Sequence, residues 1–145
     1  MEYEKPPKRI TRQEALKIAD DEFSLLMRAY HAGEDGMVRC KTCGIQMEWR
    51  GTGIAHWGHY MRREFMWTRY DPNNGAVQCE GCNVGGHGMP KEMRAYLLGI
   101  HGEEEVGRIE MEHKRMLHAY TMDLIDLSET FKAKRIEIQT EKGLL

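Results

Sequence analysis

The sequence contains no long apolar run. None of its uninterrupted apolar stretches approaches about 18 residues, so nothing predicts a membrane-spanning helix, and we expect no membrane partner. The first ten residues lack the apolar centre of a signal peptide, so we expect a cytoplasmic chain. Neither sign of charge is in large excess, because the net charge is −2. This balance argues against indiscriminate nucleic-acid binding. The 145 residues fit one small domain, for which we expect no nucleotide cofactor.

Cysteine is rare, and its four copies form two identical pairs. Cys40 and Cys43 make one Cys-x-x-Cys pair, Cys79 and Cys82 make the other, and 35 residues separate them. This spacer lets a tight turn direct two thiolates at one point about 2.3 Å away, and two turns complete a tetrahedral zinc site. Two disulfides or two redox-active pairs are the alternatives, but a reducing compartment disfavours structural disulfides. The pattern favours a structural Zn²⁺ held by all four thiolates.

A histidine-containing segment lies between the two pairs. Residues 56–60 read HWGHY, and aromatic residues around a glycine favour a short strand with a close backbone approach. On such a strand His59 shares a face with Trp57, and His56 shares the other face with Gly58. A histidine side chain, with an ordinary pKa of about 6.5, can take a proton from water near neutral pH. A partly buried, hydrogen-bonded histidine is the alternative.

A second polar segment surrounds the later cysteine pair. Residues 71–75, DPNNG, predict a turn, and residues 77–79 predict a short strand entering the pair. If a helix begins near Asn83, Asn83 and His87 would share one face and could complete a divalent-metal site. The glycine-rich stretch around His87 is poor helix material, so an exposed loop histidine is the alternative.

Together these segments resemble the HNH, or ββα-metal, nuclease motif in its zinc-stapled form. They are most similar to the NinG (Rap) recombination proteins of lambda-like phages, and they are also similar to phage recombination endonuclease VII. The resemblance spans roughly residues 37–102. It rests on the cysteine pairs, Gly-His-Tyr at 58–60, Arg-Tyr-Asp at 69–71, Asn74, and the Gln-Cys and Cys-Asn steps at 78–79 and 82–83.

The resemblance implies a metal-dependent DNA endonuclease that hydrolyses phosphodiester bonds in branched or recombining DNA, in a phage or prophage setting. It implies that His59 is the general base and that Asn74 orients the strand or its histidine. It also implies that Asn83 binds a catalytic Mg²⁺ or Mn²⁺, which would stabilise charge on the scissile phosphate.

Two positions depart from the family pattern. Gly58 stands where many such nucleases carry an Asp or His ligand, and Ala76 stands where the family often places a His. The catalytic metal therefore needs another ligand, for which His56 and His87 are the candidates. A zinc module that binds DNA or a recombination partner without cleaving is the alternative. A purely structural zinc-stapled interaction protein is a third interpretation.

Basic and aromatic residues alternate after the histidine segment. Arg62, Arg63 and Arg69 enclose Phe65 and Trp67, an arrangement that suits a groove tracking a nucleic-acid backbone. An exposed basic loop around a small apolar plug is the alternative. Binding through these arginines would weaken with salt.

The flanking segments predict helices, which makes the expected fold class α+β. We expect a small zinc-stapled ββα-metal core at 37–102, strands near 37–39, 45–49 and 54–60, a turn at 50–53, and a helix at 90–100. Residues 1–36 would supply a mobile basic arm and a helix from an N-cap at Thr11 to about Tyr30. The apolar face of that helix, which we expect to be core, comprises Leu16, Ala19, Phe23, Leu26 and Tyr30.

Residues 103–145 predict one long amphipathic helix reaching about residue 138. Its apolar positions alternate three- and four-residue steps from Val106 through Met116 and Tyr120 to Phe131. Such a seam needs a partner, so we expect a homodimer through this helix. An intramolecular helical hairpin is the alternative.

Overall fold

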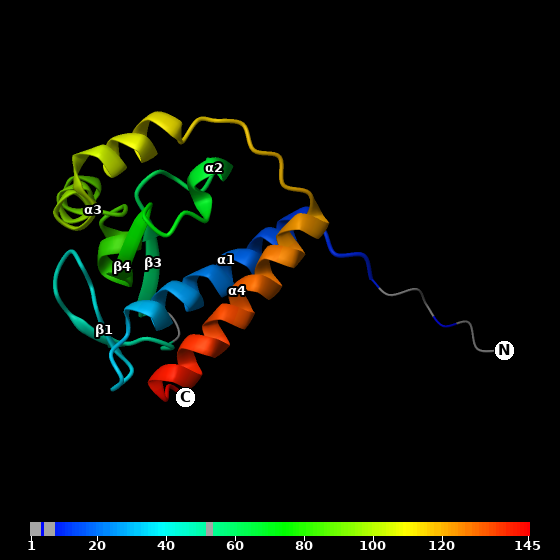
Figure 1. Ribbon diagram of the computed structural model, residues 1–145, viewed down its shortest axis with the longest axis horizontal. Coiled ribbons are helices and arrows are strands. Elements are labelled where there is room, and N and C mark those ends of the chain that lie inside the picture. Colours follow the sequence, from blue (N-terminus) through cyan, green and yellow to red (C-terminus); the bar gives the residue numbers. More distant parts are fainter. Residues whose placement is uncertain (1–3, 5–7, 52–53) are drawn as a thin grey trace.

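The computed structural model describes residues 4, 8–51 and 54–145 of the chain, and it has an α+β fold (Figure 1). Most of the predicted basic arm, and the second half of the predicted turn at 50–53, lie outside these residues. The helices are α1 (Arg12–His31), α2 (Met66–Arg69), the π-helical turn η1 (Gly81–Gly85), α3 (Pro90–Glu112) and α4 (Thr121–Lys142). The strands are β1 (Met37–Arg39), β2 (Gln46–Glu48), β3 (Ala55–His59) and β4 (Gly75–Cys79).

Helix α1 begins where its cap predicts. The Thr11 hydroxyl accepts a hydrogen bond from the Glu14 backbone N–H at 3.1 Å, which satisfies one of the free N–H groups of the first turn. Ala19, Phe23 and Leu26 are buried on its inner face, as the periodicity predicts. Tyr30 is 62% exposed instead of buried, because the apolar face turns toward Met27 and Ala29 at this end of the helix.

Helices α1 and α4 lie side by side and run in the same direction (Figure 1). Near their first turns the Arg12 Nε donates to the Ala119 carbonyl at 3.0 Å. In the middle the mostly buried Arg135 pairs with Glu22 at 3.1 Å. At the far end Lys142 Nζ donates to the carbonyls of Ala29, Tyr30 and Ala32, which satisfies carbonyls that the end of α1 leaves free.

The strands form two separate antiparallel pairs. Strand β1 pairs with β2, and β3 pairs with β4 so that His56 lies opposite Gln78 and Gly58 opposite Ala76. The predicted strands are therefore confirmed. Gly75 lies against the Gly58 carbonyl and the Trp57 ring, and this close approach leaves no room for a side chain there.

Two apolar clusters hold the fold together. The larger one joins α1, α4 and both sheets around Phe23, Trp49, Trp57, Val77 and Phe131. Phe23 meets Trp57 edge-on, with ring centroids 6.0 Å apart. The smaller one packs α3 on β4 through Ala76, Met93, Leu97 and Val106. The β3–β4 pair therefore lies between the two helical layers.

The expected single helix from 103 to about 138 is wrong. Gly102 has a φ of 84° and a ψ of 169°, so α3 contains a sharp break there, as the His-Gly step at 101–102 indicates. Helix α3 then ends at Glu112, and α4 begins only at Thr121. The seam does not continue across this gap, because Met116 and Tyr120 are 78% and 74% exposed. Among the described helices, none has the length and apolar content needed to cross a membrane.

Candidate active site and cysteine cluster

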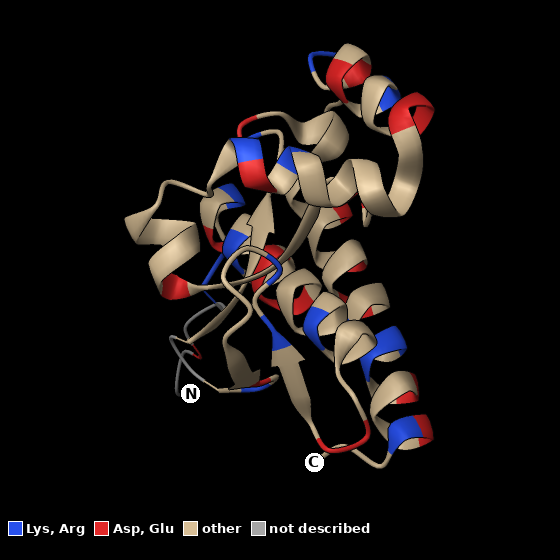
Figure 2. Cartoon of the chain, turned by 90° about the vertical axis from the view of Figure 1, so that its left-hand side faces the viewer, with Lys and Arg blue, Asp and Glu red and all other residues tan. Residues whose placement is uncertain are grey.

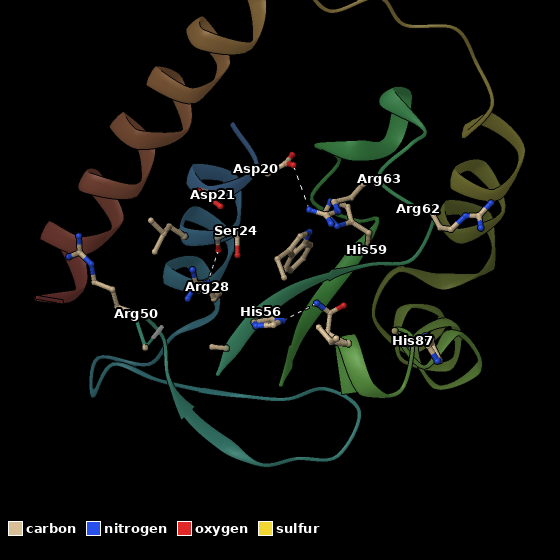
Figure 3. Close-up of a pocket in the computed structure, with 17 residues that line it drawn as sticks. Asp20, Asp21, Ser24, Arg28, Arg50, His56, His59, Arg62, Arg63 and His87 are labelled. Atoms are coloured by element: carbon tan, nitrogen blue, oxygen red, sulfur yellow. Dashed lines mark hydrogen bonds and ion pairs between the residues drawn. The ribbon is translucent and has the colours of Figure 1, made fainter. Parts of the chain in front are cut away.

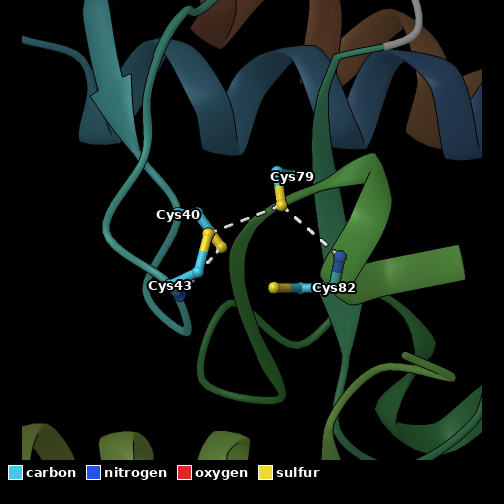
Figure 4. Close-up of side chains that lie close together, drawn as sticks. All are labelled: Cys40, Cys43, Cys79 and Cys82. Atoms are coloured by element: carbon cyan, nitrogen blue, oxygen red, sulfur yellow. Dashed lines mark hydrogen bonds between the residues drawn. The ribbon is translucent and has the colours of Figure 1, made fainter. Parts of the chain in front are cut away.

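The two Cys-x-x-Cys pairs come together at the ends of two strands (Figure 4). Cys40 directly follows β1 and Cys79 ends β4, and the four Sγ atoms all lie within 4.8 Å of one another. The Sγ atoms of Cys43 and Cys79 are 3.7 Å apart. Thiolates about 2.3 Å from a tetrahedral ion are separated by about 3.8 Å, so the cluster has the dimensions to hold a metal ion.

The local backbone prepares these thiols for a metal. The Cys43 N–H donates to Cys40 Sγ at 3.5 Å, and the Cys82 N–H donates to Cys79 Sγ at 3.4 Å. Burial raises the pKa of the Cys40 thiol, but hydrogen bonds from surrounding backbone N–H groups outweigh burial and lower it to about 6. All four cysteines are free thiols, so the alternative of two disulfides is not realised.

His59 is held by a backbone carbonyl at the end of β3. Its Nε2 lies 2.9 Å from the Arg69 carbonyl oxygen, which can only accept, so Nε2 carries the proton and Nδ1 has the free lone pair. Burial lowers the pKa of His59 to about 4, while the hydrogen bond to Arg69 and the charge of Asp20 act in the opposite direction. The imidazole is therefore neutral at pH 7.

Asn74 holds the segment that follows His59. Its side chain is completely buried, accepts from the Met61 N–H at 2.8 Å, and donates to the carbonyls of Met61 and Thr68 at 3.0 Å each. The Asn74 carbonyl also accepts from the Tyr60 N–H at 2.8 Å. These bonds tie the loop after β3 to the loop before β4, and so they hold both ends of the His59–Arg69 contact in place.

Asn83 and His56 meet beside the cysteine cluster. Asn83 lies on η1, and its Nδ2 is 3.1 Å from His56 Nδ1 on β3. The amide can only donate through this nitrogen, so His56 Nδ1 carries the lone pair and the Asn83 Oδ1 points away from it. A Cβ placed on Gly58 would lie 3.3 Å from that Oδ1.

Gly58 has no room for an Asp or His side chain, the residue types that the HNH pattern often has at this position. A Cβ there would overlap the Gln78 side-chain amide, which fills the space opposite. Gln78 is fully buried, and its Nε2 donates to the Thr42 hydroxyl and the Gly88 carbonyl at 2.9 Å each. Its Oε1 accepts no hydrogen bond from the described part of the chain. Two amide oxygens, from Gln78 and Asn83, thus converge on the Gly58 backbone.

His87 lies outside the helical turn that carries Asn83. Its φ is 53°, in the left-handed region, and it is exposed in the turn after η1. The helix face that would have paired it with Asn83 does not form, because η1 ends at Gly85. His87 is therefore an exposed loop histidine, which was the alternative interpretation of this glycine-rich stretch.

The three arginines differ in environment. The side chains of Arg62 and Arg63 are 79% and 63% exposed, and each has one carboxylate partner, Glu64 and Asp20 respectively. The Arg69 side chain is only 12% exposed and forms two hydrogen bonds with the Asp20 carboxylate, at 2.6 and 2.9 Å. Arg69 therefore supports the loop from inside and is not presented on the surface.

A cavity of about 890 Å³ gathers most of the predicted site residues (Figure 3). It is bounded by α1, β3, the loop after β3 and the η1 region. Its lining includes His56, His59, Arg62, Arg63, Asn83 and His87. The structure thus brings together six residues that lie up to 31 positions apart in sequence.

Sequence reasoning missed the contribution of α1 to this cavity. Asp20, Ser24 and Arg28 line its wall, and Asp20 contacts the loop that holds His59. One signal was present. Asp20 follows Leu16 by four residues and precedes Phe23 by three, so a carboxylate occupies the inward-facing stripe of the helix.

Comparisons of the chain with protein-family models, with curated proteins and with solved structures find no match.

Proposed function

We propose that this protein is a zinc-stabilised, metal-dependent DNA endonuclease of the HNH type. The observation that carries the proposal is the His59 imidazole, neutral and anchored through Nε2, in the same cavity as the Asn83–His56 pair and two exposed arginines. A general base beside oxygen and nitrogen ligands and phosphate-binding cations is the arrangement that phosphodiester hydrolysis requires.

The cysteine cluster fits a structural Zn²⁺. Its four sulfurs lie within 4.8 Å of one another and leave no position for water or substrate, which is typical of structural zinc sites. Its role would be to fix β4 and η1, so that Asn83, which directly follows Cys82, lies beside His56.

The Asn83–His56 pair fits a catalytic Mg²⁺ or Mn²⁺. The Asn83 Oδ1, and the Gln78 Oε1 that accepts no hydrogen bond within the described part of the chain, are neutral oxygen donors of the kind that such ions accept. The His56 Nδ1 lone pair already accepts from the Asn83 amide, so in this arrangement His56 would orient Asn83 and would not itself bind the ion. His87 is the further candidate from the same cavity. When bound, the ion would stabilise negative charge on the scissile phosphate and the leaving oxygen.

The chain's own residues would perform the proton transfer and the positioning. His59 Nδ1 takes a proton from water, and the hydroxide oxygen bonds to phosphorus as the bond to the leaving oxygen breaks. The Arg69 carbonyl holds the Nε2–H throughout and keeps the imidazole in the reactive tautomer. Arg62 and Arg63, exposed at the mouth of the cavity, bind the neighbouring phosphates.

The deciding experiment is cleavage of a labelled four-way junction, linear duplex and splayed DNA by zinc-loaded protein with Mg²⁺ or Mn²⁺. We expect cleavage of the branched substrates, and we expect His59→Ala to lose about 10²- to 10⁴-fold in rate while keeping its zinc and fold. Arg39→Ala, a substitution outside the cavity, is the matched control. Cleavage that survives His59→Ala, or wild-type protein inactive with both metals, would refute the proposal.

One observation favours a second candidate, a zinc module that binds DNA without cutting it. No carboxylate can enter at Gly58, because the Gln78 amide occupies that space. The remaining oxygen donors, from Asn83 and Gln78, are neutral, and neutral ligands hold Mg²⁺ weakly. Salt-sensitive binding of the junction with no cleavage under either metal would establish this candidate.

A further inference from the structure

Asp20 of α1 contacts three residues of the proposed nuclease core. Its carboxylate accepts from Arg69 Nε at 2.9 Å and from Arg69 Nη2 at 2.6 Å, a two-point pairing that fixes the guanidinium plane. It also accepts from the Tyr70 hydroxyl at 2.8 Å, and Arg63 lies 3.7 Å away. The Asp20 side chain is only 14% exposed, so these contacts are largely shielded from solvent (Figure 3).

The residue that Asp20 holds is the one that holds His59. The Arg69 side chain pairs with Asp20, and the Arg69 carbonyl accepts from His59 Nε2 at 2.9 Å. Arg69 ends α2, which has four residues and is too short to be stable alone. The position of its carbonyl therefore depends on tertiary contacts. Besides Asp20, the Arg69 guanidinium donates to the Arg63 carbonyl at 2.6 Å and lies 5.9 Å from the centroid of the Tyr70 ring.

The charges around His59 also favour a role for Asp20 in holding Arg69. The groups around His59 include the cations Arg62, Arg63 and Arg69, with Asp20 as the counter-charge from α1. Without Asp20, the Arg69 guanidinium would be a mostly buried charge with no carboxylate, which costs more free energy than the intact pair. The guanidinium would then move toward solvent and take its backbone with it.

We propose that Asp20 is a positioning residue for the His59 base, acting through Arg69, and that α1 is thus a working part of the active site. This inference rests on the proposed function of His59. Asp20 itself lies outside residues 37–102, the segment that resembles HNH nucleases. Helix α1 then adds an anchor for the Arg69 side chain, whereas Asn74 ties the same loop through the neighbouring Thr68 carbonyl.

The test compares Asp20→Asn with Glu22→Gln in the full chain. Glu22 is the matched control, because it is also an α1 carboxylate paired with a mostly buried arginine, Arg135, away from the cavity. The first readout is the ¹⁵N spectrum of the His59 imidazole, which reports its tautomer and needs neither DNA nor metal. The second is kcat against KM for cleavage of the four-way junction.

We expect wild type and Glu22→Gln to show His59 only as the Nε2–H tautomer, and Asp20→Asn to show a mixture. We expect kcat to fall about 10- to 100-fold in Asp20→Asn with KM little changed, as for other residues that orient a catalytic group. Asp20→Glu, which keeps the carboxylate, should recover part of this loss. Glu22→Gln should lose stability only.

The inference is overturned if Asp20→Asn keeps the wild-type tautomer and kcat while losing only as much stability as Glu22→Gln. Wild-type protein that cleaves no substrate would refute the proposed function alone. The ¹⁵N comparison would then still decide whether Asp20 orients His59. A tautomer mixture already present in wild type would refute the role of the Arg69 carbonyl, and the inference with it.

Discussion

At the scale of single residues, one hydrogen bond decides which nitrogen of His59 is free. A carbonyl oxygen at 2.9 Å requires Nε2–H and leaves the lone pair on Nδ1. The cysteine cluster was accessible from sequence, because the two-residue spacing is a local pattern. An organising role for Asn74 was expected only from the family resemblance, since its contacts with Met61 span 13 positions. The burial of Arg69 was not, because it depends on Asp20, a residue 49 positions away on another helix.

We predict that His59 titrates near pH 4, because burial lowers its pKa to about 4. In the proposed mechanism the neutral imidazole is the base, so we expect cleavage to stay constant from pH 8 to about 5 and to fall only below that. As the pH falls, His59 takes up its proton in the unfolded chain first, at about pH 6.5. The contribution of neutral His59 to the free energy of unfolding is therefore fully present above pH 6.5 and is lost as the pH falls toward 4. An NMR pH titration of the His59 ring checks this; titration near 6.5 would show a solvated ring.

We predict that Gly58→Ala destabilises the protein by about 1–3 kcal/mol, because the new Cβ overlaps the Gln78 amide. The added substitution Gln78→Ala should remove the overlap, so the double variant should lose less than the two single losses added together. Thermal unfolding measures all three. Gly99→Ala, where a Cβ meets open space on α3, is the control and should be neutral or stabilising. Simple additivity would contradict the packing described here.

At the scale of elements, the break between α3 and α4 shows that apolar periodicity alone does not predict where one helix ends and the next begins. The three- and four-residue steps continue through 113–120, yet the two halves bury their apolar residues against different partners. Val106 packs with the cluster on β4, whereas Leu124 is buried where α4 lies on α1. A single straight helix cannot pack on both β4 and α1. Strand positions, by contrast, followed from turn residues and alternation, and those were predicted correctly.

We predict that Gly102→Ala destabilises the protein by about 1–3 kcal/mol. Gly102 has a φ of 84° and a ψ of 169°, a backbone conformation that is essentially restricted to glycine, even though a Cβ would meet no neighbour there. Gly107→Ala is the control in the same helix, since its surroundings are open and it should stabilise α3 by about 0.5–1 kcal/mol. Urea unfolding compares them; equal effects would mean that the break carries no strain.

At the scale of the whole molecule, the larger cluster joins both sheets to the helices, so loss of the metal should be felt throughout. We predict one zinc per chain and a large, reversible drop in the unfolding midpoint after chelation, restored by Zn²⁺ but not by Mg²⁺. Metal analysis and circular dichroism measure both. Cys43→Ser should reproduce the loss, whereas Thr42→Ser, between the two ligands, should retain zinc. An unchanged midpoint after complete zinc removal would contradict this prediction.

Self-association stays a prediction at this scale. Phe131 of the expected seam is buried within the chain against Phe23 of α1, so this part of the seam packs intramolecularly, although the two helices are parallel and do not form the alternative hairpin. Charges of both signs are interspersed along the helices (Figure 2). Light scattering at working concentration would determine whether the chain pairs with a second copy.

The packing of α1 against α4 has a consequence for the order in which contacts form during synthesis. Helix α1 ends at His31 and its partner begins at Thr121, so a ribosome must make the whole intervening segment before the two can meet. Contacts of such long sequence separation form late. The side of α1 that carries Asp20 can pack on β3 and the loop after it as soon as those segments are made, whereas its other side stays uncovered until α4 has been added. A nascent chain would therefore carry the cysteine cluster before α4 covers the outer side of α1.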